Sequence, residues 1–211
     1  MWAAGIAGGA AAVSNWAIVG PGYNRLLSAV VVVVGAAVAL TGNLVVGLIA
    51  TVLAFAAGVF GRRHQPAAVL FALSATGFLV VAETEGGFIP AVTGTVLLGA
   101  MTSVMLLGHW FLVDPQLPRQ ALQRLDVVAG TGVVADAVVL VALGALGAGD
   151  GVMIGAFAAL AIMSALLTTG VWFSLREPAY SGVMAATGLS YLGVLTAFGA
   201  VVVGRLLLGS Q

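Results

Sequence analysis

Asp136 is the only charged residue of the apolar segment 127–148. It lies about ten residues from either end, and therefore near the middle of a membrane if this segment spans one. A carboxylate at that depth is unfavourable, and such residues usually face the interior of a helix bundle and mark an ion or substrate pathway. Because burial disfavours the charged form and no arginine is expected at the same depth, Asp136 is predicted to be a neutral, hydrogen-bonding or proton-exchanging acid.

Further polar residues are expected at a similar depth, on three other apolar segments. They are Thr102, Ser103, Ser164 and Tyr191. Together with Asp136 they predict a polar cluster that binds a small solute or an ion. The alternative is a structural role, in which Asp136 makes a hydrogen bond between helices that contributes about 0.6–2 kcal/mol.

His109 carries a second candidate site, near the end of the apolar segment 88–113. Met101 and Met105 precede it and share its helix face. Methionine and histidine ligate haem iron and Cu(I), but one helix face cannot supply both axial sides of a haem. The alternatives are a single-histidine contact with haem or a quinone, and a histidine that only packs at the membrane interface.

Two residue types are missing from the sequence, and their absence excludes several chemistries. Without lysine there is no Schiff-base residue for retinal or pyridoxal phosphate (PLP). Without cysteine there is no thiolate for Fe–S clusters and no covalent attachment of haem. The apolar segments contain no paired acids, zinc motif or Ser–His arrangement, so no catalytic residue or metal site is predicted and an enzyme is not favoured.

The composition is typical of a polytopic membrane protein. Of 211 residues, 62% are hydrophobic and 7% are charged, whereas globular proteins carry about 25% charged residues; a soluble enzyme and a nucleic-acid binder are thereby excluded. A span needs about 20 apolar residues, which predicts an all-α bundle of eight transmembrane helices in a single membrane domain, or seven if the first lies on the surface. The predicted helices are 2–20, 26–41, 44–60, 66–82, 88–113, 127–148, 152–175 and 183–204.

The arginines lie in alternate loops, and this pattern predicts the orientation. The odd-numbered loops hold Arg25, Arg62, Arg63, Arg119, Arg124 and Arg176. The even-numbered loops hold Glu83, Glu85 and Asp150 and no basic residue. By the positive-inside rule the arginine loops are cytoplasmic, which places both termini outside the plasma membrane if eight helices span it. These arginines are expected to bind lipid head groups, while Arg205 at the end of the last helix breaks the pattern and stays unexplained.

The longest loop, residues 114–126, is predicted to contain a short interfacial helix. Its leucines share an apolar face, and its arginines can reach lipid phosphates. Asp126 is interpreted as the beginning of the helix that follows this loop.

Two segments resemble each other closely enough to predict an internal repeat. Residues 16–25 read WAIVGPGYNR and residues 110–119 read WFLVDPQLPR, so that Trp, Val, Pro and Arg match without a gap. Collinear matches further along the chain pair the first four helices with the last four. We therefore expect pseudo-repeats 1–87 and 88–211, related in parallel by a pseudo-two-fold axis along the membrane normal.

The repeat also brings two tryptophans and their neighbours into correspondence. Asn15 and Trp16 align with His109 and Trp110. If the axis runs between the halves, these four residues face each other near the cytoplasmic side and form a pseudo-symmetric site.

Two functions agree with these features. The first is translocation of a small solute or an ion, with proton linkage, through a site around Asp136. The alternative is a membrane anchor or accessory subunit of a respiratory-type complex that contacts a quinone or haem through His109. The expected partners are the lipid bilayer and either partner membrane subunits or a second copy of the chain; nucleic acid is not expected.

Overall fold

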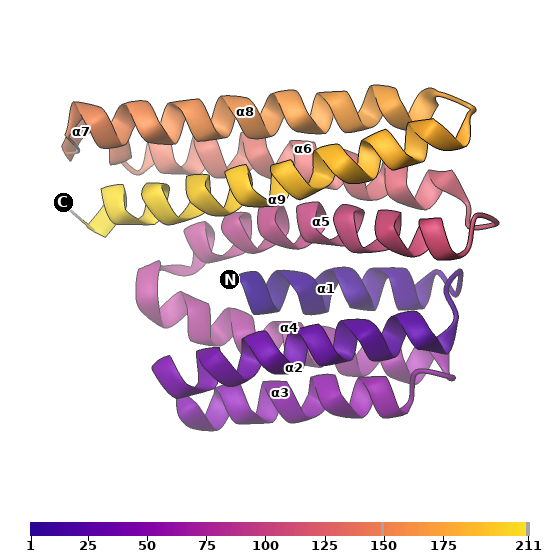
Figure 1. Cartoon of the computed structure of the whole chain (residues 1–211). Helices are drawn as coiled ribbons and strands as arrows, with labels where there is room; N and C mark the ends of the chain where they lie inside the picture. Colours follow the sequence, from indigo (N-terminus) through magenta and orange to yellow (C-terminus); the bar gives the residue numbers. More distant parts are fainter. Residues whose placement is uncertain (149, 210–211) are drawn as a thin grey trace. The chain divides into compact units, whose positions relative to one another are not determined.

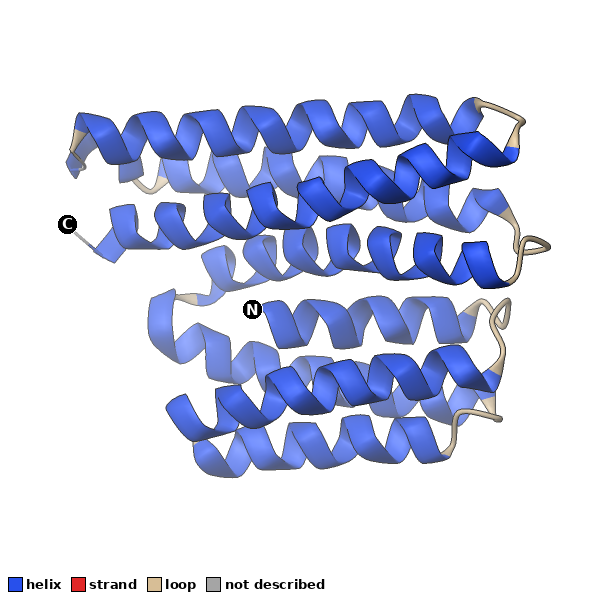
Figure 2. Cartoon of the chain, viewed as in Figure 1, coloured by secondary structure: helices blue, strands red, loops and turns tan. Residues whose placement is uncertain are grey.

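The computed structural model describes residues 1–148 and 150–209, and all regular structure within them is helical (Figures 1 and 2). The helices of this part are α1 (Trp2–Asn15), α2 (Pro21–Thr41), α3 (Leu44–Val59), α4 (His64–Gly86), α5 (Phe88–Val113), α6 (Arg119–Ala142), α7 (Ala145–Ala148), α8 (Gly151–Arg176) and α9 (Tyr180–Gly209). The side chains of residues 84–86, 146 and 148 are outside the description, and with them that of the predicted loop acid Glu85. The all-α fold predicted from composition is confirmed.

Six helices of the described residues are long and apolar enough to cross a membrane. They are α2, residues His64–Glu83 of α4, α5, α6, α8 and α9. With 14 and 16 residues, α1 and α3 reach only about 21 and 24 Å at 1.5 Å per residue, less than the bilayer core of about 30 Å. The structure therefore supports a multi-pass helical membrane bundle, and the count of eight spans stays a prediction.

The prediction for the sixth helix was wrong at both ends. Helix α6 begins at Arg119, directly after Pro118, and ends at Ala142. The chain then turns at Gly144, whose φ of +84° suits glycine, into the single helical turn α7. The helix thus ends inside the apolar run of residues 127–148, and the composition of that run does not indicate where.

No separate interfacial helix exists between residues 114 and 126, because residues 119–126 are the first turns of α6. Leu122 and Leu125 are buried, and they continue the buried stripe of α6 through Ala129 and Val133. Packing this stripe inside a bundle removes it from lipid and water on all sides. The predicted apolar face therefore exists, but it packs against other helices of the bundle rather than on the membrane surface.

The chain forms two compact units, residues 1–85 and 86–211. In the first unit, α2 packs against α1 and α3, and Ser74 of α4 donates a hydrogen bond of 2.8 Å to the carbonyl oxygen of Ala50 in α3. In the second unit, α5 packs against α6 and α9, and α8 packs against the same two helices. The second unit is therefore a closed four-helix bundle.

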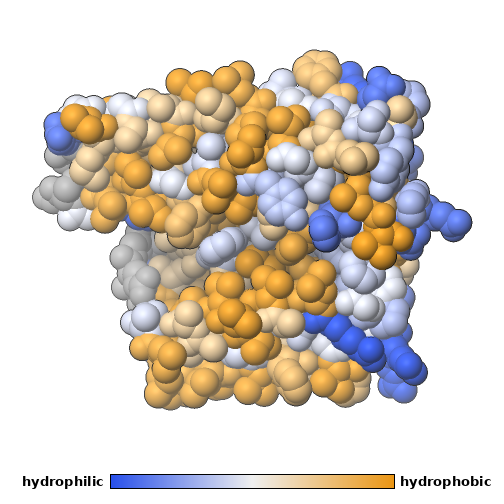
Figure 3. Space-filling model, viewed as in Figure 1, coloured by the Kyte–Doolittle hydropathy of each residue, from blue (hydrophilic) through white to orange (hydrophobic). Residues whose placement is uncertain are grey.

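The outer faces of the long helices are apolar. Val33 and Phe55 in the first unit, and Leu166, Phe173 and Leu195 in the second, are all more than half exposed. Figure 3 shows apolar surface along the sides of the helices and hydrophilic surface at helix ends. Large apolar patches of this kind indicate contact with lipid or with other apolar helices.

Small residues allow close contact between helices, and Gly132 of α6 is the clearest case. A Cβ atom at this position would lie 2.9 Å from the Cα atom of Leu97 in α5, which is backbone and cannot rotate away. Close approach of helix backbones at glycine is a common basis of helix association in membranes.

Gly132→Ala is therefore expected to lower the free energy of unfolding by about 1–3 kcal/mol through overpacking of α5 against α6. The matched control is Gly155→Ala in α8, where nothing lies within 4 Å of the added carbon; it should be neutral or stabilise by about 1 kcal/mol. Thermal unfolding of both variants in detergent measures the difference. Equal stabilities would contradict the close α5–α6 contact.

Candidate functional site

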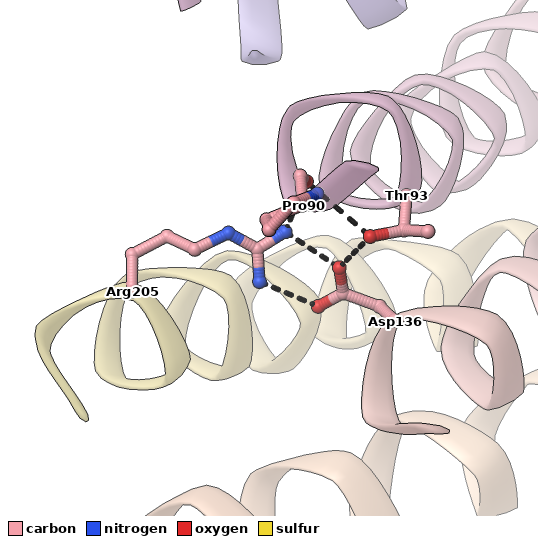
Figure 4. Close-up of polar contacts among 4 residues, drawn as sticks. All are labelled: Pro90, Thr93, Asp136 and Arg205. Carbon is pink, nitrogen blue, oxygen red and sulfur yellow. Dashed lines mark hydrogen bonds and ion pairs between the residues drawn. The ribbon is translucent and has the colours of Figure 1, made fainter. Parts of the chain in front are cut away.

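Asp136 is paired with Arg205 inside the second unit. The guanidinium of Arg205 donates from Nη2 to Oδ1 of Asp136 at 2.6 Å and from Nη1 to Oδ2 at 3.1 Å (Figure 4). Only 2% of the Asp136 side chain and 14% of the Arg205 side chain are exposed. This bidentate geometry is the strongest form of an arginine–carboxylate interaction.

Helix α5 completes the site with a hydroxyl and a carbonyl group. Thr93 donates a hydrogen bond of 2.6 Å to Oδ1 of Asp136, and Nη2 of Arg205 also donates to the carbonyl oxygen of Pro90 at 2.5 Å. Pro90 is tolerated here because it lies in the first turn of α5, where its missing N–H has no helical partner to lose. The charge pair thus joins α5, α6 and α9.

The expectation that no arginine lies at the depth of Asp136 was wrong. Since α6 ends at Ala142, Asp136 lies about 9 Å from the end of its helix rather than at the centre. Helix α9 runs in the same direction as α6 (Figure 1) and continues to Gly209, which places Arg205 inside it at a similar depth. Arg205, unexplained by the loop pattern, is the counter-ion of Asp136.

A small cavity adjoins Asp136 between all four long helices of the second unit. It has a volume of about 10 Å³, which is room for about one water molecule. The lining residues are Leu97, Val133, Asp136, Ala137, Phe157, Ala161, Ser164 and Ala200. Asp136 and Ser164 are its polar members, and the Ser164 hydroxyl also lies 2.9 Å from that of Thr196 in α9.

The predicted polar cluster is therefore brought together in part. Ser164 joins Asp136 at the cavity, whereas Thr102 and Ser103 are buried in α5 and do not line it. The Thr102 hydroxyl donates to the carbonyl oxygen of Leu98 in its own helix at 2.6 Å. Tyr191 lies at the exposed surface of α9, away from this cavity.

Asp126 is a second buried acid that sequence reasoning did not assign to the site. It is the eighth residue of α6 and only 3% exposed, not the beginning of a helix. Its Oδ1 atom has no hydrogen-bond partner among the described residues. Ten residues separate it from Asp136 on the same helix, or about 15 Å along the axis. The signal that could have found it is its position on the buried stripe that Leu122 and Leu125 begin.

Two hydroxyl groups of α8 lie at heights between those of these two acids. Thr168 faces Gly130, one helical turn after Asp126: a Cβ atom on Gly130 would lie 3.8 Å from the Thr168 hydroxyl oxygen. Ser164, one turn from Thr168 on α8, reaches the cavity at Asp136. Both hydroxyls are hydrogen-bonded to carbonyl oxygens of their own helix. Helix α8 therefore presents two hydroxyl groups toward α6 at heights between those of Asp126 and Asp136.

His109 is exposed at the surface of the second unit, with its Nδ1 atom 3.5 Å from the hydroxyl oxygen of Tyr191. Asn15 is also exposed, and Trp16 and Trp110 are half-buried. Asn15 and His109 belong to different units, so the pseudo-symmetric site stays a prediction. Within residues 1–148 and 150–209, no three His, Asp or Glu side chains come together as a metal site.

The loop arginines divide into two groups. Arg119 donates hydrogen bonds to the carbonyl oxygens of Glu177, Pro178 and Ala179, so it holds the connection between α8 and α9. The others are exposed: Arg25, Arg62, Arg63, Arg124 and Arg176. Arg176 lies over the ring of Trp172, 4.8 Å from its centroid, in a cation–π contact. Contact of these arginines with lipid head groups stays a prediction.

Removal of either charge of the Asp136–Arg205 pair is expected to destabilise the second unit, because the remaining charge is left buried. Asp136→Asn and Arg205→Met should each lower the free energy of unfolding by about 3–5 kcal/mol, and the double variant by much less than their sum. Unfolding of the four proteins in detergent measures this coupling. Additive losses would contradict a direct interaction.

No family model matches the chain, and no curated protein or solved structure matches it either.

Proposed function

We propose that the protein translocates protons across a membrane through the interior of its second unit. The observation that carries this proposal is the position of three ionisable side chains, the buried Asp126 and Asp136 and the partly buried Arg205, between the helices of an apolar four-helix bundle. Ionisable groups are unfavourable inside a membrane bundle and usually mark ion or proton pathways. Replacing a buried ion pair by apolar residues is often neutral or stabilising, so stability alone does not require charged residues at these positions.

The pathway follows the α6–α8 interface. Asp126 offers an unpartnered buried carboxyl oxygen that can take up a proton. The hydroxyls of Thr168 and Ser164 can each donate and accept a hydrogen bond, and they lie between Asp126 and the cavity at Asp136. A water molecule in that cavity would bridge Ser164 and Asp136. In this proposal a proton passes between the two carboxyl groups along this interface, and the hydroxyls must turn from the carbonyl oxygens of their own helix to relay it.

Arg205 determines which cargo this pathway accepts. A guanidinium keeps its charge under all ordinary conditions, so a metal cation approaching Asp136 would be repelled at close range. A proton exchanges on the carboxyl group itself and needs no space. The cavity, at about 10 Å³, has room for about one water molecule and for no larger solute. Size and charge together favour protons over the small solutes that the sequence also allowed.

We further infer that the two units are the repeats expected from the sequence. Each contains four helices of 14 residues or more, and the boundary between residues 85 and 86 lies close to the expected one. In the first unit, Asn24 at the start of α2 donates to the carbonyl oxygen of Gly61 between α3 and α4. Arg119 at the start of α6, one position beyond the equivalent of Asn24, makes a similar contact with the loop between α8 and α9. In this arrangement the arginine-bearing loops are cytoplasmic.

A second candidate function rests on the exposed neighbours His109 and Tyr191. An imidazole beside a phenol at a lipid-facing surface can donate hydrogen bonds to the carbonyl oxygens of a quinone. A protein with this role would copurify with quinone or with partner subunits. A Soret band in the visible spectrum would indicate haem in place of quinone.

Proton flux into liposomes tests the proposed function. The purified protein, reconstituted with a pH-sensitive dye inside, should acidify the lumen when a potassium diffusion potential drives protons inward. Asp126→Asn and Asp136→Asn should each lower the rate on the order of 10²-fold, as loss of a proton-transfer group typically does. The control is Asp150→Asn, which changes the acid that caps α8 and keeps the cap, since asparagine caps equally well.

Folding is checked separately by gel filtration and thermal unfolding of each variant, so that lost flux is compared only among folded proteins. Wild-type flux in folded Asp126→Asn would overturn the pathway. A wild-type protein that conducts potassium or sodium as readily as protons would overturn the cargo.

A further inference from the structure

A groove runs along the outer surface of the first unit, between α2 and α3. Its volume is about 600 Å³, within the range of about 300–1,000 Å³ that is usual for small-molecule sites. The lining residues are Arg25, Ser28, Ala29, Val32, Val33, Phe55, Gly58 and Val59. No part of the proposed proton pathway lies in this unit, so the groove needs an explanation of its own.

The sequence spacing explains the shape of the groove. The lining residues of α2 recur at intervals of three and four, so they form one stripe on the helix face that meets α3. The two helices touch at its floor, where a Cβ atom on Gly58 would collide with the side chain of Ser28. Val33 and Phe55 form walls that are more than half exposed. The groove is therefore shallow, open along its length and apolar.

Charge is present at one end of the groove only. Arg25 lies in the second turn of α2, and the lining continues to Val33, eight residues or about 12 Å further along the helix. Of the lining residues, Arg25 is the one that is charged, and Ser28 next to it is the one that is polar. A ligand that fits has a negative group at the Arg25 end and an apolar chain that extends toward Val33.

We propose that this groove binds an anionic phospholipid, with its phosphate on the Arg25 guanidinium and one acyl chain along Ala29, Val32 and Phe55. The distance of about 12 Å approaches the depth of one leaflet, which is half of a hydrocarbon core of about 30 Å. An arginine at the membrane surface attracts anionic head groups, and the lining contains no acid that would oppose one. If a second copy of the chain covered the groove, the positive charge of Arg25 would have no known partner.

Native mass spectrometry of the full chain with added phosphatidylglycerol or phosphatidylcholine tests this site. The wild-type protein should prefer phosphatidylglycerol by about fivefold, which corresponds to one arginine at the surface. Arg25→Gln should remove that preference, and Ala29→Phe, which fills the exposed groove, should remove tight binding of both lipids. Arg124→Gln is the matched control, because it removes another exposed arginine outside the groove, and should keep the preference.

Equal affinity of the wild-type protein for the two lipids would overturn the proposal, as would tight lipid binding by folded Ala29→Phe. A dimer that Ala29→Phe dissociates would also overturn it, because a second copy would then cover the groove. Proton flux does not enter this test, so its result is independent of the proposed function.

Discussion

The ion pair between Asp136 and Arg205 is the interaction on which the second unit depends. Two charges inside an apolar bundle are unfavourable unless each finds its partner at close range, and the loss of one leaves the other without compensation. The pair therefore requires α6 and α9 to lie at one relative height, and Thr93 and the Pro90 carbonyl add α5 to the same requirement. In this way one contact determines how three helices are placed along their axes.

The polar interior of this unit is narrow. Most of its hydroxyl groups donate hydrogen bonds to carbonyl oxygens of their own helix, as those of Thr102 and Thr187 do. Among the described residues of this unit, the buried side-chain atoms without a hydrogen-bond partner are Oδ1 of Asp126 and Nε of Arg205, and a cavity of about 10 Å³ lies beside Asp136. A cavity of this size admits a water molecule, whereas a larger solute would need the helices to separate.

The lengths of the apolar runs and the positions of the charged residues between them made much of the fold predictable. The expected helix 88–113 coincides with α5, and the arginine loops fall at helix ends, because apolar runs must match the bilayer and charges must leave it. Prediction failed at α6, where Leu122 and Leu125 looked like a surface helix. An apolar stripe indicates that a face is buried, but its sequence does not say whether lipid or another helix buries it.

The sequence by itself determined the class of the protein, the approximate helices and the position of Asp136 as the one charge within an apolar segment, since each follows from local composition and the bilayer as solvent. Only the tertiary structure decided that Arg205 neutralises Asp136, that Ser164 shares its cavity and that Asp126 is buried. The physical reason is distance along the chain. Asp136 and Arg205 are 69 residues apart, and periodicity within a helix carries no information on which distant side chain will face it.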